Sequence, residues 1–223
     1  MPNTSLRRTI VATAPWAAGL AAVSLTSLAQ AHVGADAGLG HTHGTFGSFM
    51  DGAAHPLTGL DHLAAMVSVG LWSALSLGTK VSSSADARRL LSAPLAFAAT
   101  LLIGALMALR GVTLPGVEPM IATSLLAMGL LVATRTALPT GVGVALVAGF
   151  ALFHGLAHGQ ELGGHAASAL AGMVLSTMAL HTVGIGAGLA LRHRSRWVPR
   201  IAGAGVTALG LGLLSPATAG AFF

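Results

Sequence analysis

His55-Pro56-Leu57-Thr58-Gly59-Leu60-Asp61-His62-Leu63-Ala64-Ala65-Met66 places two imidazoles, a carboxylate and a thioether at the start of a run without charge from Val67 to Gly78. Ionisable side chains are costly inside lipid and mark functional sites there. A second cluster, Phe153-His154-Gly155-Leu156-Ala157-His158-Gly159-Gln160-Glu161, follows about 90 residues later. Together the two stretches indicate a metal site in a membrane protein.

The composition is that of an integral membrane protein. Hydrophobic residues make up 54% of the 223 residues and charged residues 8%, whereas a soluble domain has about 25% charged residues. The sequence pI of 11.6 does not indicate a nucleic-acid partner, because the basic residues form short clusters between apolar runs and not a basic face. The chain has no cysteine, which excludes disulfides, iron–sulfur centres and thiolate metal ligands.

Residues 1–31 have the pattern of a cleaved secretory signal peptide. Two arginines precede an apolar run over residues 10–28, and Ala29-Gln30-Ala31 fits a cleavage site. The alternative is a retained first membrane helix. Cleavage would give His32 a free amine beside its imidazole, a candidate chelating pair. We expect residues 32–54 to be a flexible periplasmic segment, in which His41 and His43 either capture metal or belong to a polar lead-in.

Six apolar spans follow, each near the ~20 residues that cross a bilayer. They cover about 57–78, 90–109, 117–133, 141–158, 166–190 and 201–220. All are expected to be helices, because a helix satisfies its own backbone hydrogen bonds in lipid. Residues 55–223 are therefore predicted to be an all-α, six-helix transmembrane domain. An inverted three-plus-three repeat is a further hypothesis, since the two halves have opposite orientations, although their sequences do not match convincingly.

Basic residues between the spans predict the orientation. Those on one side of the membrane are Lys80, Arg88, Arg89, Arg135, Arg192, Arg194, Arg196 and Arg200, and the other side has Arg110. The positive-inside rule places the larger group in the cytoplasm, in agreement with an exported N-terminus. We predict a multi-pass protein of the bacterial inner membrane with both termini periplasmic and both histidine clusters at the periplasmic face.

In the first cluster, His62 and Met66 are four residues apart and share a helix face. Asp61 points about 100° away from His62, and His55 precedes the helix, so the chain must fold back to bring these groups together. An alternative explains part of the pattern without metal, because Thr58 and Asp61 fit a capping-box-like helix start. It leaves both histidines unexplained.

In the second cluster, His154, His158, Glu161 and His165 follow spacings of 4, 3 and 4. On a continuous helix they fall within an arc of about 60°, although Gly159 and the glycines after it weigh against a helix that continues so far. The alternative is interfacial histidines beside a solvated acid. Imidazole and carboxylate ligands suit Ni(II), Co(II), Zn(II) or Fe(II).

His181 lies deep in the span 166–190. An intramembrane histidine is a functional candidate, and the equal alternative is a core histidine that hydrogen-bonds a neighbouring helix. Met66 and His181 are candidates for the onward path of a metal ion.

Both clusters resemble the motifs of the HupE/UreJ family of nickel/cobalt permeases. The first is His-Pro-x-x-Gly-x-Asp-His from His55, followed by Met66-x-x-Val69-Gly70-Leu71-Trp72, and the second is Phe-His-Gly-x-Ala-His-Gly-x-Glu over residues 153–161. The resemblance covers all six spans. It implies uptake of Ni²⁺ or Co²⁺ for hydrogenase, urease or cobalamin synthesis, which composition and spacing do not show.

The resulting prediction is a secondary-type permease, not an enzyme, that carries a divalent metal from periplasm to cytoplasm. Its expected ligands are His55, Asp61, His62, His154, His158 and Glu161. No prosthetic cofactor is expected, and the chain has no nucleotide-binding motif. The alternatives are a membrane metal-binding accessory and a metalloenzyme without transport activity. Besides metal and lipid, a second copy of the chain and a downstream metallochaperone are candidate partners.

Overall fold

The computed structural model describes residues 44–77, 83–193 and 196–215, and the regular structure of these residues is entirely α-helical. The helices are α2 (Thr45–Thr58), α3 (Leu60–Leu75), α4 (Ser84–Leu109), α5 (Val117–Thr134), α6 (Thr140–Glu161), α7 (Ala166–Leu191) and α8 (Trp197–Leu214). The predicted signal peptide and the candidate ligands His32, His41 and His43 lie outside the described residues.

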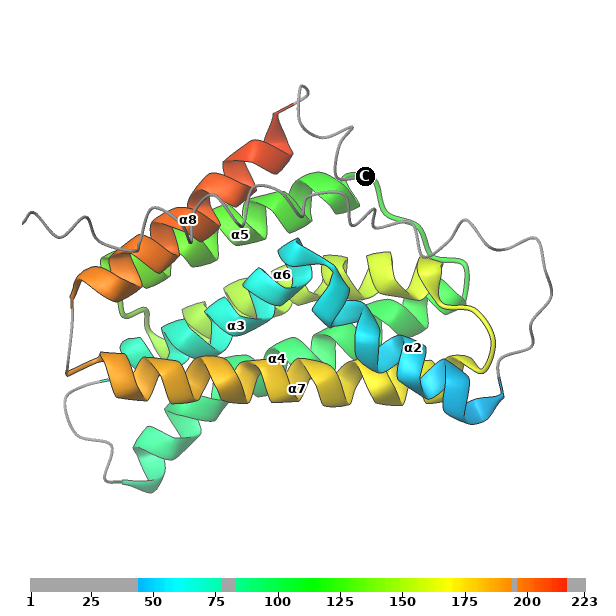
Figure 1. The fold of residues 1–223 in the computed structure, drawn as a ribbon, viewed down its shortest axis with the longest axis horizontal. Coiled ribbons are helices and arrows are strands. Elements are labelled where there is room, and N and C mark those ends of the chain that lie inside the picture. The colour runs from blue at the N-terminus through cyan, green and yellow to red at the C-terminus, as the bar shows by residue number, and fades with distance from the viewer. Residues whose placement is uncertain (1–43, 78–82, 194–195, 216–223) are drawn as a thin grey trace, which may run out of the picture.

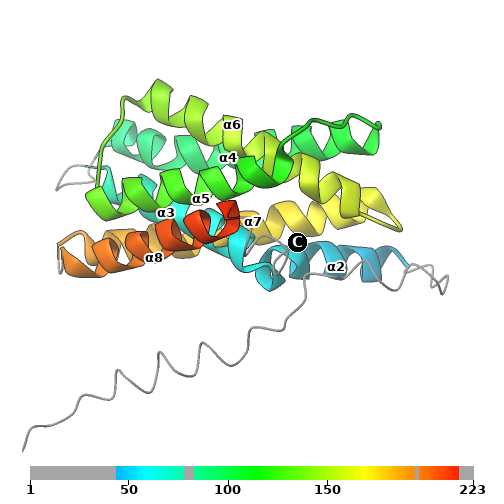
Figure 2. The ribbon, with the colours of Figure 1, turned by 90° about the horizontal axis from the view of Figure 1, so that it is seen from above.

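Five helices, α4 to α8, are long and apolar enough to cross a membrane. They coincide with the last five predicted spans and lie side by side in one bundle (Figures 1 and 2). Helix α4 begins earlier than its apolar pattern, because a capping box formed by Ser83 and Asp86 satisfies its first backbone N–H groups. The prediction of an all-helical membrane fold is confirmed.

The first predicted span differs from a single helix. Residues 57–78 contain the end of α2 and the whole of α3, a 16-residue apolar helix, and the helical path breaks at Gly59. The expectation of a flexible lead-in is wrong for residues 45–54, which are helical. This helix, α2, is stabilised by close packing against α7. Gly52 of α2 lies against the backbone of Ala169, and Gly172 of α7 lies against the backbone of Phe49.

Helices α2 and α3 follow the same direction as α7, one beside its first half and one beside its second half (Figure 1). Ser48 in α2 accepts a hydrogen bond from the backbone N–H of His165 just before α7, and Val67 in α3 packs on Gly184. The 26 residues of α7 are about 39 Å long. The motif from His55 to His62 thus lies at the break between two helices that both pack on α7, and not at the start of one continuous helix.

Glycines bring two helix pairs into backbone contact in the same way. A Cβ on Gly70 of α3 would collide with the carbonyl oxygen of His181 in α7, and a Cβ on Gly155 of α6 would collide with that of Leu101 in α4. The contacts correspond residue by residue: Gly70 with Gly155, Val67 with Leu152, Leu71 with Leu156, His181 with Leu101, Gly184 with Gly104, and Ile185 with Ala105. The α4–α6 pair therefore repeats the packing of the α3–α7 pair.

The third pair, α5 and α8, packs reciprocally as well. A Cβ on Gly129 would lie 2.5 Å from the backbone nitrogen of Thr207, and a Cβ on Gly203 would collide with that of Ala133. Small residues at membrane-helix interfaces allow this close van der Waals contact, which replaces the hydrophobic effect as the force of association.

These contacts predict different effects for two alanine substitutions in α6. Gly155→Ala should destabilise the bundle by about 1–3 kcal/mol, because the new methyl group forces α6 away from α4. Gly149→Ala is the matched control, since its Cβ meets open space and alanine favours the helix by up to ~1 kcal/mol. The measurement is the thermal midpoint of the detergent-solubilised protein. Equal midpoints for the two variants would contradict the packing described here.

Candidate metal-binding site

Three helix ends bring the predicted ligands together. The last turn of α2 holds His55, the first turn of α3 holds Asp61 and His62, and the last two turns of α6 hold the second cluster. The ring of His62 contacts the other three, with its centroid 5.9 Å from that of His55, 5.3 Å from that of His154 and 4.4 Å from that of His158. The rings of His55 and His158 also touch, at a centroid distance of 4.7 Å. Helix breaks and ends thereby place four imidazoles in one group.

The outer part of the group is formed by His55, His158 and Glu161. Each offers a ligand atom, and these atoms lie within 4.8 Å of one another. The shortest separation is 3.0 Å between His55 Nε2 and Glu161 Oε2. The Glu161 side chain is 58% exposed, whereas His158 is 1% exposed. The group is therefore open to the surface at Glu161, partly open at His55 (29% exposed) and closed at His158.

Asp61 determines which nitrogen of His62 carries the proton. His62 Nδ1 lies 2.8 Å from Asp61 Oδ1, and because a carboxylate accepts, Nδ1 carries the hydrogen. His62 Nε2 then presents a lone pair. It is buried and has no hydrogen-bond partner among the described residues. A carboxylate that orients a histidine in this way is typical of metal sites.

Ser124 of α5 acts in the same way on His154. Its hydroxyl donates to the carbonyl of Ile121 at 2.6 Å, so it has no further proton to give and accepts from His154 Nε2 at 3.0 Å. The lone pair of His154 is therefore on Nδ1, which is buried without a partner among the described residues. Both ring nitrogens of His158 are also buried without a hydrogen-bond partner among the described residues.

A buried polar atom without a hydrogen bond costs about 1–3 kcal/mol. The rings that carry these atoms are neighbours, since the centroid of His62 lies 4.4 Å from that of His158 and 5.3 Å from that of His154. A neutral imidazole binds metal through its unprotonated nitrogen, and the carboxylates of Asp61 and Glu161 would balance the charge of a cation bound beside these rings. The geometry therefore fits a metal-binding site better than a group of packed core histidines.

The capping-box interpretation of Thr58 and Asp61 is wrong. Gly59 is the N-cap of α3 and forms no side-chain cap, while the Thr58 hydroxyl donates to the carbonyl of His55. A Cβ on Gly59 would lie 2.9 Å from both Asp61 Oδ1 and His62 Nδ1. Glycine at this position makes room for the Asp61–His62 pair.

The two residues proposed for the onward path meet one turn beyond His62. His181 Nδ1 donates to the carbonyl of Met66 at 2.8 Å, so its lone pair is on Nε2, which is buried without a partner among the described residues. The Thr177 hydroxyl donates to the sulfur of Met66 at 3.4 Å. The Phe97 ring contacts both His154 and His181, at centroid distances of 5.6 and 5.1 Å.

Sequence reasoning missed Ser124 and Phe97 and did not assign Gly59 its role beside the ligands. A serine in an apolar span was a visible signal, but its partner depends on how α5 packs against α6. His165 does not join the group, because α6 ends at Glu161 and His165 is an exposed residue before α7.

The fold and the site define an all-helical, multi-pass membrane protein that encloses a histidine-rich site between its helices. The family model described as "HupE / UreJ protein" matches residues 20–213. Protein HupE of Rhizobium leguminosarum bv. viciae is 39% identical over 198 residues, which cover 87% of this chain and 94% of that protein. The chain belongs to the HupE/UreJ family. No solved structure matches it.

The Asp61–His62 contact generates a prediction for the purified protein. Asp61→Asn should weaken Ni²⁺ binding about 10–100-fold, because loss of the carboxylate frees the His62 tautomer and removes a compensating charge. Asp86→Asn, a change of the same chemistry at the start of α4, should leave the affinity unchanged. Isothermal titration provides the measurement, and equal affinities for both variants would refute the role given to Asp61.

Proposed function

We propose that this protein transports divalent nickel, cobalt or both from the periplasm to the cytoplasm. The observation that carries the proposal is the set of buried imidazole nitrogens on His62, His154 and His158 that have no hydrogen-bond partner among the described residues. Membership of the HupE/UreJ family supports a role in nickel or cobalt supply for metalloenzyme maturation, as for hydrogenase and urease, or for cobalamin synthesis.

The ligand chemistry agrees with this cargo. Imidazole nitrogens suit nickel, cobalt, zinc and iron, and magnesium and calcium prefer a shell of oxygen atoms. We assign metal coordination to His55, His62, His154, His158 and Glu161, with Asp61 in the position of an orienting and charge-balancing carboxylate. The metal is a cargo in this proposal, so no prosthetic group is invoked.

Transport also requires a path beyond the first site. His181 offers an unpartnered Nε2 and Met66 a thioether sulfur one turn further along α3. We propose that the ion passes from the histidine group toward these two residues.

The repeated packing favours a transporter over a metal-binding accessory or a metalloenzyme. The glycine contacts of α3 with α7 are equivalent to those of α6 with α4, and the contacts between α5 and α8 are reciprocal. The glycine contacts are therefore unchanged when α3 is superposed on α6, α7 on α4 and α5 on α8. This is the relation expected of two three-helix halves with opposite orientations, in which α2 and α3 together form the first of six spans. Inverted repeats of this kind place a binding site on a broken helix near the bilayer centre and allow alternating access.

The direction of transport follows from the basic residues. Helix α4 begins, α5 and α7 end, and α8 begins at one end of the bundle (Figure 1). Arg88, Arg89, Arg135, Arg192, Arg196 and Arg200 are at these helix ends. The positive-inside rule places that end in the cytoplasm of a bacterial inner membrane, with both chain termini in the periplasm.

Metal uptake tests the function directly. His158→Ala should reduce uptake of radiolabelled Ni²⁺ and Co²⁺ into cells at least tenfold, because this residue contacts the rings of His55 and His62 and offers a ligand atom within 4.8 Å of those of His55 and Glu161. His193→Ala is the matched control, since His193 is exposed beyond the end of α7, and it should retain uptake. Membrane content of each variant is measured by immunoblot. Normal uptake by His158→Ala at normal abundance would overturn the proposed site.

An experiment with the purified protein in liposomes distinguishes transport of the metal from binding alone. A permease binds Ni²⁺ and also accumulates it inside the vesicles, whereas an accessory protein only binds it. Binding without accumulation would favour the accessory, and metal-dependent turnover of a test substrate would favour the enzyme.

Cysteine labelling tests the orientation. Because the chain has no cysteine, Gly163→Cys and Ser84→Cys introduce single thiols at exposed positions on opposite ends of the bundle. In intact cells, an impermeant thiol reagent that reaches the periplasm should label Gly163→Cys and leave Ser84→Cys unlabelled. The opposite pattern would place the site on the cytoplasmic side and would change the proposed uptake to export.

A further inference from the structure

Six aromatic rings form a series in which each ring contacts the next. In order, they are the rings of His55, His158, His62, His154, Phe97 and His181. The centroids of successive rings are 4.7, 4.4, 5.3, 5.6 and 5.1 Å apart. Five of the rings are imidazoles, which can bind metal, whereas the phenyl ring of Phe97 has no ligand atom. The series of candidate ligands is therefore interrupted once, at Phe97.

The ring series leads from the surface into the protein. The side chains of His55 and His62 are 29% and 13% exposed, whereas Phe97 and His181 are 2% and 1% exposed. Phe97 follows the four histidines of the metal-binding group and precedes His181. A cation that enters beside the exposed carboxylate of Glu161 would therefore meet Phe97 before it meets His181.

The two imidazoles that contact Phe97 both have an unsatisfied nitrogen. His154 Nδ1 and His181 Nε2 are buried and have no hydrogen-bond partner among the described residues. Their rings make no contact with each other in the part of the chain that the structure describes, and each contacts the phenyl ring. Phe97 therefore keeps two potential metal ligands apart and satisfies neither of them.

The repeated packing does not itself require a large ring at this position. His181 of α7 corresponds to Leu101 of α4 in the two helix pairs, so one turn earlier Thr177 corresponds to Phe97. The Thr177 hydroxyl donates to the sulfur of Met66. One half of the repeat thus has a small polar side chain where the other half has a phenyl ring against two imidazoles.

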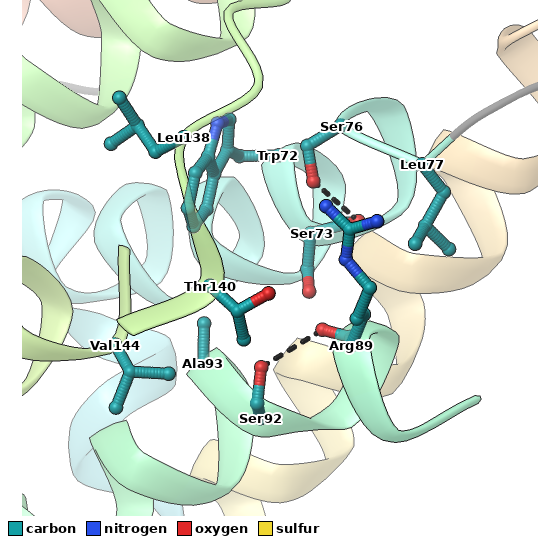
Figure 3. Close-up of a pocket in the computed structure, with 10 residues that line it drawn as sticks. All are labelled: Trp72, Ser73, Ser76, Leu77, Arg89, Ser92, Ala93, Leu138, Thr140 and Val144. Carbon is teal, nitrogen blue, oxygen red and sulfur yellow. Dashed lines mark hydrogen bonds between the residues drawn. The ribbon is translucent and has the colours of Figure 1, made fainter. Parts of the chain in front are cut away.

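Helix α4 can bend one turn before Phe97. Pro94 has no N–H to donate to the carbonyl of Leu90, and the Ser73 hydroxyl of α3 donates to that carbonyl instead. A cavity of about 20 Å³, lined in part by Ser73 and by Ser92 of α4, lies beside the same turn (Figure 3). Helices kink at proline, so a bend here would change the position of Phe97 relative to the histidine rings.

We propose that Phe97 is the barrier between two successive positions of the cation, the metal-binding group and His181. This inference rests on the transport function proposed above. With the phenyl ring in place, the cation is held by the group and His181 is not among its ligands. When α4 bends at Pro94, the ring leaves its contacts with His154 and His181, and the cation reaches Nε2 of His181.

The Ni²⁺ affinity of the purified protein tests where the barrier lies. Phe97→His adds a ligand between His154 and His181 and should tighten Ni²⁺ binding at least tenfold. The gain should disappear when His181→Ala is added, because the new imidazole connects the two positions. Phe97→Leu is the matched control, since leucine has no ligand atom, and its affinity should stay within twofold of the starting protein. Isothermal titration measures affinity, and the thermal midpoint shows that each variant is folded.

His181→Ala alone completes this comparison. In the protein that keeps Phe97, it should change the Ni²⁺ affinity by less than twofold, because the phenyl ring separates His181 from the bound cation. It should nevertheless slow the entry of Ni²⁺ into liposomes that contain the purified protein, because the cation then lacks its next ligand.

The rate of Ni²⁺ entry into these liposomes tests the barrier itself. Phe97→Ala should raise the rate at least threefold, because the cation no longer waits for the ring to move. Loss of a ring that only fills the core would destabilise the protein and would not speed transport. Leu101→Ala is the matched control, since it removes a buried side chain from the next turn of α4, and it should not raise the rate. Phe97→Leu, the smaller truncation, should raise the rate at least twofold and replaces Phe97→Ala if that variant fails to fold.

The outcomes distinguish this inference from the transport function. The expected affinities together with faster entry in a Phe97 variant support the barrier. The barrier is overturned if His181→Ala weakens Ni²⁺ binding in the protein that keeps Phe97, if Phe97→His leaves the affinity unchanged, or if Leu101→Ala speeds entry as much as the Phe97 variants. The expected affinities without Ni²⁺ entry in any variant support the separation of the two positions and refute transport. Absence of Ni²⁺ binding by the starting protein refutes both.

Discussion

Buried imidazole nitrogens without hydrogen-bond partners are the constraint on which the rest of this structure depends. Each would cost about 1–3 kcal/mol in a protein that used its histidines only for packing. The described residues fix the tautomers of His62 and His154 through Asp61 and Ser124, and α6 brings the ring of His158 to a centroid distance of 4.4 Å from that of His62. The surrounding structure thus fixes where these lone pairs lie, which is the preorganisation that the proposed metal binding requires.

The broken helix α2–α3 provides the position for these groups. A continuous helix would present His55 and His62 seven residues apart, about 10 Å along the axis. The break at Gly59 instead brings the two rings to a centroid distance of 5.9 Å. Irregular backbone at membrane depth is tolerated only where protein or a polar cavity covers it. Here α7 packs on α2 before the break and on α3 after it, while the histidine rings of α6 lie against the residues around the break.

Close glycine contacts explain how a chain with few polar residues forms a defined bundle. The same contact pattern joins α3 to α7 and α4 to α6. The two helix pairs therefore pack alike, although they carry different polar side chains. One end of the bundle has histidines and a carboxylate, and the other has hydroxyls and a tryptophan.

The sequence by itself determined the helical class, because only helices satisfy the backbone in lipid. It also determined that His154, His158 and Glu161 share a face, since their spacing follows the helix period. It did not show that residues 45–54 form a helix against α7, because α2 depends on contacts with glycines more than 100 residues away.

Only the tertiary structure decided which rings meet at the break between α2 and α3, the role of Gly59 and the choice of Ser124 as partner of His154. Each depends on the distance between atoms of helices that are far apart in the chain. Local spacing determines the face on which a side chain lies, and helix packing determines what that side chain meets.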